Sequence, residues 1–541
     1  MTFRLRSESS APTVLSALAL SVLLAACGGG KPDDPAAVAV PQCSGSTCPA
    51  QGQPPSTPAV AAKLCPDTLD YSTTYTGGSG SGEYVKVKFD STKKQYQMTF
   101  IDSAVPTSAG QVNTTRAGLT ITGDYDNPSG ALALPTAEQN RCAIVLKNGA
   151  TADGSYSVTI NPQDPPMLFV GQGILGGGIP GATIQFDGIS TLGFPIGLVP
   201  SRTFDSYPFL GFSETVTDFS QVAGTYNEVG FRVNPEGSTV QSTDGGITMT
   251  GWAPTAIQTT ETLNADGTCT SSSSLYSCSL TGTPWTLRTN ADGTPDNVFI
   301  SNTPATSPTL GYPAVGVGTE QVLFAQSLAH GIMIVGKVNN QLVPVMIRVG
   351  YAHTDAGTDI ASIFNNALDD QLGISLLAPA TTVAQTTLTG GYIGANSASA
   401  CGAVTTIGQN PSTIYDNGTY VYAATGSCSD GSASFNAGVN YGATLFQNPT
   451  AALLNPFTSS VSSNLALDYT QTQPGFINVT ANKDLMSGST SIFKAGDTGV
   501  MVKVGPVYGL LMNGINPTYL TNDPSNVYHV NPFLAIGAFV E

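Results

Sequence analysis

The feature that most restricts the fold of this chain is an alternation of apolar and polar side chains with a period of two residues. From Tyr84 to Asp90 the apolar side chains share one face, and after the polar residues 91–94 the pattern resumes with Tyr96, Met98 and Phe100. Successive side chains of a strand point to opposite faces of a sheet. Two alternating runs around a short polar turn therefore predict a β-hairpin.

Further hairpin signals recur along the chain. The segment Asn-Ala-Asp-Gly-Thr occurs at 264–268 and at 290–294, and Asp-Gly between strand-like runs favours a tight hairpin turn. Apolar runs at 331–338 and 342–349 flank Asn339-Asn340, another turn candidate. The 60 glycines and 36 prolines are distributed along the whole chain, as expected for many turns between short strands. We therefore predict an all-β protein with two or three antiparallel β-barrel or β-sandwich domains.

Two segments depart from this pattern. Between 359 and 372 the apolar residues fall on one helical stripe, with Thr358 or Asp359 as a start and Gly373 as an end. This predicts one connector helix near 359–372. The glycine-rich segment 176–181 is followed by a strand-like run without the lysine of a phosphate loop, so we predict a tight turn there.

Composition shifts divide the 541 residues into several parts, in line with a length prior of about three or four domains. Residues 28–62 contain seven prolines and little apolar bulk. A Pro-rich linker of this length extends to roughly 100 Å. The expected organisation is a signal peptide at 1–26, a Pro-rich tether at 27–62, β domains at 63–215, 216–357 and 386–541, and the connector at 358–385.

The N-terminus has the layout of a secretory signal. Arg4 and Arg6 precede an apolar run that ends in Leu24-Ala-Ala-Cys27. This ending resembles the lipobox of bacterial lipoproteins, which implies cleavage before Cys27, acylation of its thiol with palmitate or a similar chain, and, with Gly28 next, anchoring in the outer membrane facing the periplasm or the surface. An ordinary signal peptide or an N-terminal membrane helix remains the alternative, although a run of about 16 residues is short for a span of roughly 20.

The cysteine count fits an exported, disulfide-bonded chain. With Cys27 lipidated, eight of the nine cysteines remain, an even number that favours four disulfides. Eight cysteines allow 105 connectivities. No Cys-x-x-Cys motif occurs, and the histidines are isolated, so we predict no metal ion or other cofactor. Proximity favours the pairs Cys43–Cys48, Cys269–Cys278 and Cys401–Cys428, which leaves Cys65–Cys142.

The charge balance restricts the partners. Lys and Arg total 19 against 36 Asp and Glu, a net charge of −17, and charged residues make up only 10% of the chain. The negative electrostatic potential of such a chain repels nucleic acid and anionic surfaces. A neutral or cationic partner fits better, over a surface of Ser, Thr, Asn and Gly.

No catalytic motif is present. The chain has neither a Gly-x-Ser-x-Gly elbow nor a His-Glu-x-x-His sequence. A Ser–His–Asp arrangement built on His330, His353 or His529 remains open. The absence of a motif favours a protein that is not an enzyme, and no catalytic residue is assigned.

Two acidic segments are calcium candidates. Asp124 with Asp126, and Asp292 with Asp296, place carboxylates close together. Neither pair has the spacing of a 12-residue calcium loop, so turns are the preferred interpretation of both.

Residues Phe219 to Tyr226 read Phe-Ser-Gln-Val-Ala-Gly-Thr-Tyr. This resembles the opening motif of lipocalins, with Tyr226 where that family has Trp. The resemblance implies a barrel over residues 219–350 with an apolar cup for a small lipophilic ligand. The alternative is a strand that enters a closed core. The whole chain also resembles an uncharacterised class of proteobacterial lipoproteins through its lipobox, its tether and its glycine-rich segment.

These observations support three functional hypotheses. The first is a binding or scaffolding lipoprotein of the cell envelope, held to the membrane by its N-terminal lipid. The second is a lipocalin-like carrier, and the third is an envelope hydrolase that acts on glycan or ester substrates. The expected partners are an envelope protein, a glycan or a small lipophilic ligand.

Overall fold

The structure is a computed structural model in which the chain separates into two units, Met1–Ala61 and Ala62–Glu541. The residues that the structure describes all belong to the second unit. The described residues are 63–111, 113–134, 136–162, 165–186, 189–191, 194–196, 199–241, 248–272, 284–301, 330–353, 367–369, 372–384, 392–397, 403–406, 422–423, 440–442, 450–454, 461–487, 490–514, 527–530 and 533–539.

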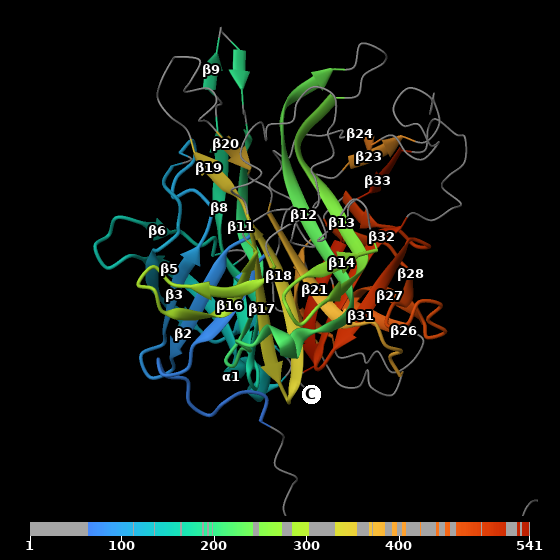
Figure 1. Ribbon diagram of the computed structural model, residues 1–541, viewed down its shortest axis with the longest axis horizontal. Coiled ribbons are helices and arrows are strands. Elements are labelled where there is room, and N and C mark those ends of the chain that lie inside the picture. The colour runs from blue at the N-terminus through green and yellow to red at the C-terminus, as the bar shows by residue number, and fades with distance from the viewer. Residues whose placement is uncertain are drawn as a thin grey trace, which may run out of the picture. The chain divides into compact units, whose positions relative to one another are not determined.

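The first large sheet is a closed antiparallel barrel, coloured blue to teal in Figure 1. Its order is β4-β3-β2-β1-β11-β8-β7-β5-β6, and an additional pairing of β4 with β5 closes it. The predicted hairpin around 91–94 is confirmed as β2 and β3, with Lys94 in the left-handed region at φ 55°. The strands are β1 (Tyr75–Ser79), β2 (Tyr84–Asp90), β3 (Gln95–Asp102), β4 (Thr120–Asp126), β5 (Ala143–Ala150), β6 (Ser157–Val158), β7 (Met167–Val170), β8 (Ile174–Phe186) and β11 (Val199–Phe212).

The glycine-rich segment 176–181 lies inside strand β8, so the predicted turn is wrong. The segment pairs with β11 from Gly176 through Pro180. A Cβ on Gly181 would lie 1.7 Å from the Phe204 carbonyl oxygen, and one on Gly177 would lie 2.1 Å from the Met167 oxygen. The glycines therefore permit the close approach of neighbouring strands. Close backbone approach is a common reason for glycine inside a strand.

The second large sheet is an open half-barrel with the order β14-β13-β12-β21-β18-β17-β16-β15, green to yellow in Figure 1. Three predicted turns are confirmed in it. The turns at 264–268 and 290–294 both close with hydrogen bonds between their Asn and Thr backbones. Asn339 and Asn340 connect β17 to β18 with φ values of 51° and 61°, as a two-residue hairpin turn requires. The strands are β12 (Gly224–Gln241), β13 (Thr248–Leu263), β14 (Cys269–Ser271), β15 (Thr286–Thr289), β16 (Pro295–Ser301), β17 (His330–Val338), β18 (Gln341–Val349) and β21 (Leu372–Pro379).

The connector helix predicted near 359–372 is wrong in the part of that range that the structure describes. Residues Ala367–Asp369 form strand β20, and Leu372 begins β21; residues 359–366 lie outside the described residues. Strand β21 is paired on both sides, with β12 and with β18. A short apolar run fits helical spacing and strand alternation equally well. Pairing with two distant strands decides the outcome here.

The third large sheet has the order β25-β22-β34-β32-β31-β28-β27-β26 and is orange to red in Figure 1. Its strands are β22 (Tyr392–Ser397), β25 (Asn440–Gly442), β26 (Thr450–Leu454), β27 (Val461–Asp468), β28 (Ile477–Ala481), β31 (Thr498–Val504), β32 (Val507–Gly514) and β34 (Phe533–Phe539). Small sheets are formed by β9 (Ile189–Thr191) with β10 (Phe194–Ile196), β19 (Tyr351–His353) with β20, β23 (Ala403–Thr406) with β24 (Tyr422–Ala423) and β33 (Val527–Val530), and β29 (Leu485–Ser487) with β30 (Thr490–Phe493).

Helical structure is minor among the described residues. It consists of α1 (Ala137–Cys142) and two single 3-10 turns, η1 (Gly130–Leu132) and η2 (Phe219–Val222). No helix in the described ranges has the length and apolar character needed to cross a bilayer. The all-β prediction is confirmed.

One hydrophobic core is shared by the three large sheets. Because residues of all three pack into a single cluster, the sheets stabilise one another. Representative members are Phe89 and Tyr207 of the barrel, Val229 and Ile347 of the second sheet, and Val502 and Ile536 of the third.

Candidate functional site

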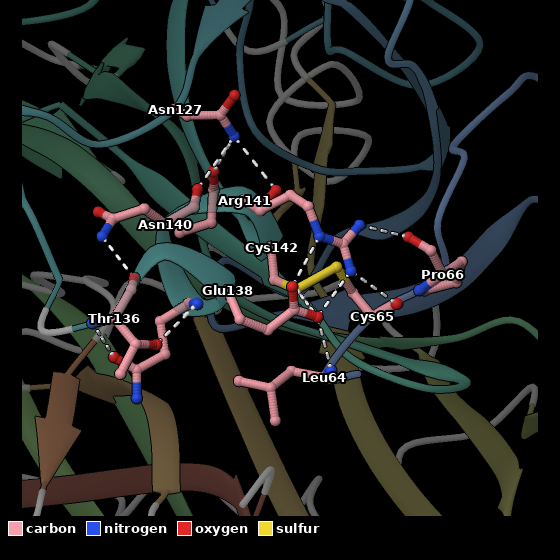
Figure 2. Close-up of a disulfide and its surroundings, with 11 residues drawn as sticks. Leu64, Cys65, Pro66, Asn127, Thr136, Glu138, Asn140, Arg141 and Cys142 are labelled. Carbon is pink, nitrogen blue, oxygen red and sulfur yellow. Dashed lines mark hydrogen bonds and ion pairs between the residues drawn. A yellow bond between two sulfur atoms is a disulfide. The ribbon is translucent and has the colours of Figure 1, made fainter. Parts of the chain in front are cut away.

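A disulfide fixes the beginning of the described unit to helix α1. Cys65 and Cys142 are bonded across 77 residues, with their Cα atoms 5.7 Å apart (Figure 2). This is the pair that remained after the three short-range pairs were assigned from the sequence. Because Cys65 directly follows the expected tether, the bond holds the place where that tether would join the barrel.

Helix α1 supports this attachment with an ion pair. Arg141 donates to the backbone oxygens of Pro66, at 2.8 Å, and Cys65, at 3.1 Å, and pairs with Glu138 at 2.7 Å (Figure 2). Glu138 also accepts from the Leu64 amide at 2.9 Å. The hydrogen bonds from Arg141 are the main reason why the pKa of Glu138 falls to about 2.

The same residues bring together three potential metal ligands, the two sulfur atoms and a Glu138 oxygen, within 4.8 Å of one another. Both sulfur atoms are already in the disulfide, and the carboxylate is held by Arg141. The cluster is a structural attachment and not a metal centre.

The other cysteines are only partly described. Cys269 is disulfide-bonded, and its predicted partner Cys278 lies outside the described residues. Cys27, Cys43, Cys48, Cys401 and Cys428 also lie outside them. Their lipidation and pairing stay predictions.

Among the histidine side chains that the structure describes, His330 meets a carboxylate. His330, at the start of β17, places its Nε2 atom 2.8 Å from the Asp102 Oδ2 atom at the end of β3. This contact joins the half-barrel to the barrel. His353 and His529 lie on β19 and β33, and their side chains are outside the described residues.

A second polar junction between barrel and half-barrel involves Asp296, one of the calcium candidates. Its Oδ1 atom accepts from Lys86 Nζ at 2.8 Å and from the Tyr84 hydroxyl at 3.1 Å, while its Oδ2 atom accepts from Arg288 at 2.9 Å. Burial opposes the ionisation of Asp296, but the hydrogen bonds and the Lys86 charge outweigh it, so its pKa is lowered. Two cationic side chains hold this carboxylate, which leaves no calcium site there.

The remaining calcium candidates are also accounted for. Asp292 caps its own turn by accepting from the Thr294 amide at 2.9 Å, as the turn interpretation predicts. Asp124 and Asp126 lie in strand β4, so the turn expected there is wrong, and Asp126 pairs with Lys147 at 2.7 Å. The alternation of the strand points both aspartates outward.

The lipocalin-like segment forms η2 and the start of β12. The Tyr226 hydroxyl donates to the Val222 carbonyl at 2.8 Å. Phe219 packs edge-on against Phe299, with ring centroids 5.0 Å apart. These side chains belong to one buried cluster with Trp285. The described part of the segment therefore matches the alternative interpretation, a strand that enters a packed core.

The barrel carries a polar pocket of about 350 Å³, here named the Asp205 pocket. Its volume lies within the range of about 300–1,000 Å³ that is usual for ligand pockets. None of its described lining residues is basic. The lining residues include Thr107, Ser108, Thr183 and Thr203, which carry hydroxyl groups, together with Tyr156 and Asp205.

Four separate parts of the chain supply these groups: the loop after β3, residues 156–159 around β6, strand β8 and strand β11. Asp205 and Thr203 lie on β11, and Thr183 on the paired strand β8, where the two threonine hydroxyls are 2.8 Å apart. The loop after β3 is held against β8 by a hydrogen bond from the Gly110 amide to the Gln185 oxygen at 3.0 Å. The pocket therefore depends on the pairing of β8 with β11 and on the position of the loop after β3.

Asp205 is the notable group in this pocket. Its carboxylate makes no hydrogen bond or ion pair with any residue that the structure describes. Burial alone raises its pKa above the ordinary value. A half-buried acceptor without a partner inside the protein is available to donors on a ligand.

A buried ion pair lies beneath the pocket. Arg116 donates to the backbone oxygens of Pro180 at 2.9 Å and Gly181 at 2.7 Å, and its Nε atom lies 3.6 Å from Glu83. Glu83 also accepts from the Ser103 hydroxyl at 2.7 Å. Because Gly181 lines the pocket, Arg116 fixes that part of its floor.

A second hollow of about 350 Å³, here named the Asp124 pocket, lies on the other side of β6. Gln95, Thr122, Asp124 and Asn148 line it, and no basic residue is among its described lining. The Gln95 amide donates to the Asp124 carboxylate at 3.4 Å.

Sequence reasoning singled out Asp124 but missed Asp205. The local signal for Asp205 is an acidic residue between two aromatic residues, Phe204 and Tyr207, because a carboxylate in a segment that is expected to be buried is costly without a partner. The barrel brings Asp205 and Asp124 to two pockets that share β6.

The model of a family described as "Protein of unknown function (DUF2957)" matches residues 95–538. The chain belongs to this family. The match covers most of the three large sheets, and the DUF2957 description assigns no activity.

Comparison with solved structures gives faint similarity. A double mutant and a single mutant of the vaccine antigen Transferrin Binding Protein B (TbpB) from Haemophilus parasuis Hp5 match with TM-scores of 0.23 and 0.22, each at 9% identity over 84% of this chain. Intact Ap-TbpB, with N and C lobes, matches at a TM-score of 0.21 and 9% identity, also over 84% of this chain. The chain spans 65% to 66% of the length of these proteins. Similarity at this level defines neither a fold nor a function, and no curated protein matches the sequence.

Proposed function

We propose that this DUF2957 protein is a lipid-anchored binding protein of the cell envelope that takes a neutral, hydroxyl-rich ligand, a glycan, in the Asp205 pocket. The observation that carries the proposal is the half-buried Asp205 carboxylate, which has no partner among the described residues and faces a lining rich in hydroxyl groups.

The chemistry of the lining selects the ligand class. Serine and threonine hydroxyls both donate and accept hydrogen bonds, as sugar hydroxyls do, whereas a carboxylate only accepts. The ring of Tyr156 offers an apolar face for the C–H side of a sugar. An anionic ligand finds no basic residue among the described lining and meets a strongly negative chain.

The lipid anchor is the second part of the proposal. The lipobox at Leu24 to Cys27 and the Pro-rich residues 28–62 support a head that stands away from the outer membrane. In such a position the pocket meets envelope glycans and has no contact with nucleic acid.

The test is a screen of the full-length lipidated protein in detergent micelles on an array of neutral and anionic glycans, followed by affinity measurement. We expect binding to a neutral glycan. Asp205→Asn should weaken it about tenfold or more, because hydrogen bonds to a charged group contribute about 1.5–3 kcal/mol. Binding should also weaken as the pH falls through the raised pKa of Asp205, since protonation removes the charged acceptor.

The matched control is Asp266→Asn, an exposed turn carboxylate on the second sheet that caps Thr268. It should leave binding unchanged. Equal affinity of the Asp205→Asn variant and the wild type would falsify the proposal, as would binding of anionic glycans alone. If the bound ligand is held through an amine and its affinity falls steeply with salt concentration, the pocket binds a cation and the glycan proposal is wrong.

A further inference from the structure

We infer that the Asp124 pocket is a second subsite for the same ligand, so that the protein recognises an oligosaccharide chain and not a single sugar. The inference rests on the proposed function of the Asp205 pocket and extends it. Three observations carry it: a shared wall, a rigid ridge between the pockets, and matching chemistry on both sides.

The two pockets have a wall in common. Ser157, Val158 and Thr159 line both of them. Val158 is buried in the barrel core, whereas Ser157 and Thr159 are exposed. Alternation in an extended segment therefore places two hydroxyl groups on the ridge that separates the pockets. A ligand that crosses this ridge meets hydrogen-bonding groups and no apolar barrier.

The ridge is held in place by the barrel. Strand β6 pairs with β5 through Gly149 and Ala150, which also line the Asp124 pocket. Just beyond the ridge, the Ile160 amide donates to the Asn148 side chain at 2.8 Å. These contacts fix the spacing of the two pockets, as a binding site for a chain with a repeating unit requires.

The Asp124 pocket repeats the chemistry of the Asp205 pocket. Each has one carboxylate, several hydroxyl groups and no basic residue among its described lining. The Asp124 pocket adds the side-chain amides of Gln95 and Asn148, which donate and accept hydrogen bonds. Both pockets therefore suit the same class of ligand, a neutral chain whose successive units carry hydroxyl or acetamido groups.

The experiment measures affinity against chain length. The probes are two ladders of linear oligomers, one of glucose and one of N-acetylglucosamine, from monomer to hexamer, added to the full-length lipidated protein in micelles. We expect an increase of about tenfold or more at the length that first reaches across β6, followed by a plateau.

Variants separate the two subsites. Asp124→Asn should remove the increase with length and leave the affinity for the shortest binding oligomer unchanged, whereas Asp205→Asn should weaken every oligomer. The matched control is Asp126→Asn on the same face of β4, because Asp126 pairs with Lys147 and does not line the pocket. It should behave as the wild type.

Hydrogen–deuterium exchange gives a readout that a purely structural role would not produce. A long oligomer should protect residues 120–126 and 145–150 together with 181–185 and 203–205, whereas a short one should protect only the second pair of segments. Affinity that is independent of length, or equal behaviour of Asp124→Asn and Asp126→Asn, overturns the second subsite alone. If neither oligomer series shows an increase of affinity with length, the second subsite is also overturned. If no neutral glycan on the array binds, the proposed function itself is overturned.

Discussion

At the scale of single residues, buried carboxyl groups differ in protonation because their partners differ. Asp296 is kept ionised because the hydrogen bonds from Lys86 and from the Asn297 amide, together with the Lys86 charge, outweigh the cost of burial. Asp205 lacks such partners among the described residues, and burial alone raises its pKa. Glu261 is the extreme case, because burial and the neighbouring Glu228 both raise its pKa above the ordinary value of 4.5.

Glu261 predicts a pH dependence of stability. The folded protein keeps a proton on this carboxyl group that the unfolded chain releases above about pH 4.5, so this contribution is complete below that pH. It is lost as the pH rises towards the folded pKa, with a limiting slope of about 1.4 kcal/mol per pH unit for one proton. Thermal unfolding of the full chain between pH 5 and pH 8 should therefore show a midpoint that falls with pH.

The Glu261→Gln variant tests the assignment. A neutral amide cannot release this proton, so the variant should have a flatter pH profile and a higher midpoint at pH 8 than the wild type. Glu214→Gln, at an exposed site that pairs with Lys337, is the control and should keep the wild-type slope. Identical slopes for both variants would show that Glu261 is ionised in the folded protein.

At the scale of elements, strand β8 shows how backbone approach shapes the site. Its glycines let β11 and β7 pass closely, and the carbonyls of Pro180 and Gly181 turn to Arg116. A turn interpretation from sequence failed because it read glycine only as a source of backbone freedom. The turns at 264–268 and 339–340 were predictable, because there the local φ values themselves demand Asn or Gly.

Two glycine-to-alanine changes in β8 should have opposite effects. Gly181→Ala places a Cβ 1.7 Å from the Phe204 oxygen, a backbone atom that cannot move aside, so we expect a loss of roughly 2–3 kcal/mol. Gly176→Ala meets nothing closer than Leu210 at 3.7 Å, and should be neutral or stabilise by about 0.4–1 kcal/mol. Chemical denaturation of both variants measures the difference. Similar stabilities would show that close packing does not explain Gly181.

At the scale of the whole molecule, three sheets share one core, and a single disulfide holds the start of this unit. A substitution in the core of one sheet is therefore expected to change the stability of the other two. The predicted anchor at Cys27 lies at the other end of the expected tether from Cys65, so the proposed binding site and the predicted membrane attachment lie in different parts of the sequence.

Cys27→Ser tests the anchor. Without the thiol no acyl chain can be attached, and each buried methylene contributes about 0.8 kcal/mol to membrane binding. We expect loss of metabolic labelling with radioactive palmitate and release of the protein from the membrane fraction, while Cys43→Ser keeps both. Membrane retention of an unlabelled Cys27→Ser protein would mean that another segment holds it.

The sequence by itself determined the all-β class and the hairpins, because alternation and turn residues are local signals. It also indicated the pair Cys65–Cys142, because eight cysteines remain beside Cys27 and the other six were assigned to three short-range pairs. The tertiary structure alone decided that 367–369 and 372–379 are strands and that residues 176–181 continue one. It also decided that Asp205, Tyr156 and Thr107 meet in one pocket. The reason is physical: the pocket is lined by four segments between residues 106 and 205 that meet only in the folded barrel, and a site built in this way has no local pattern to reveal it.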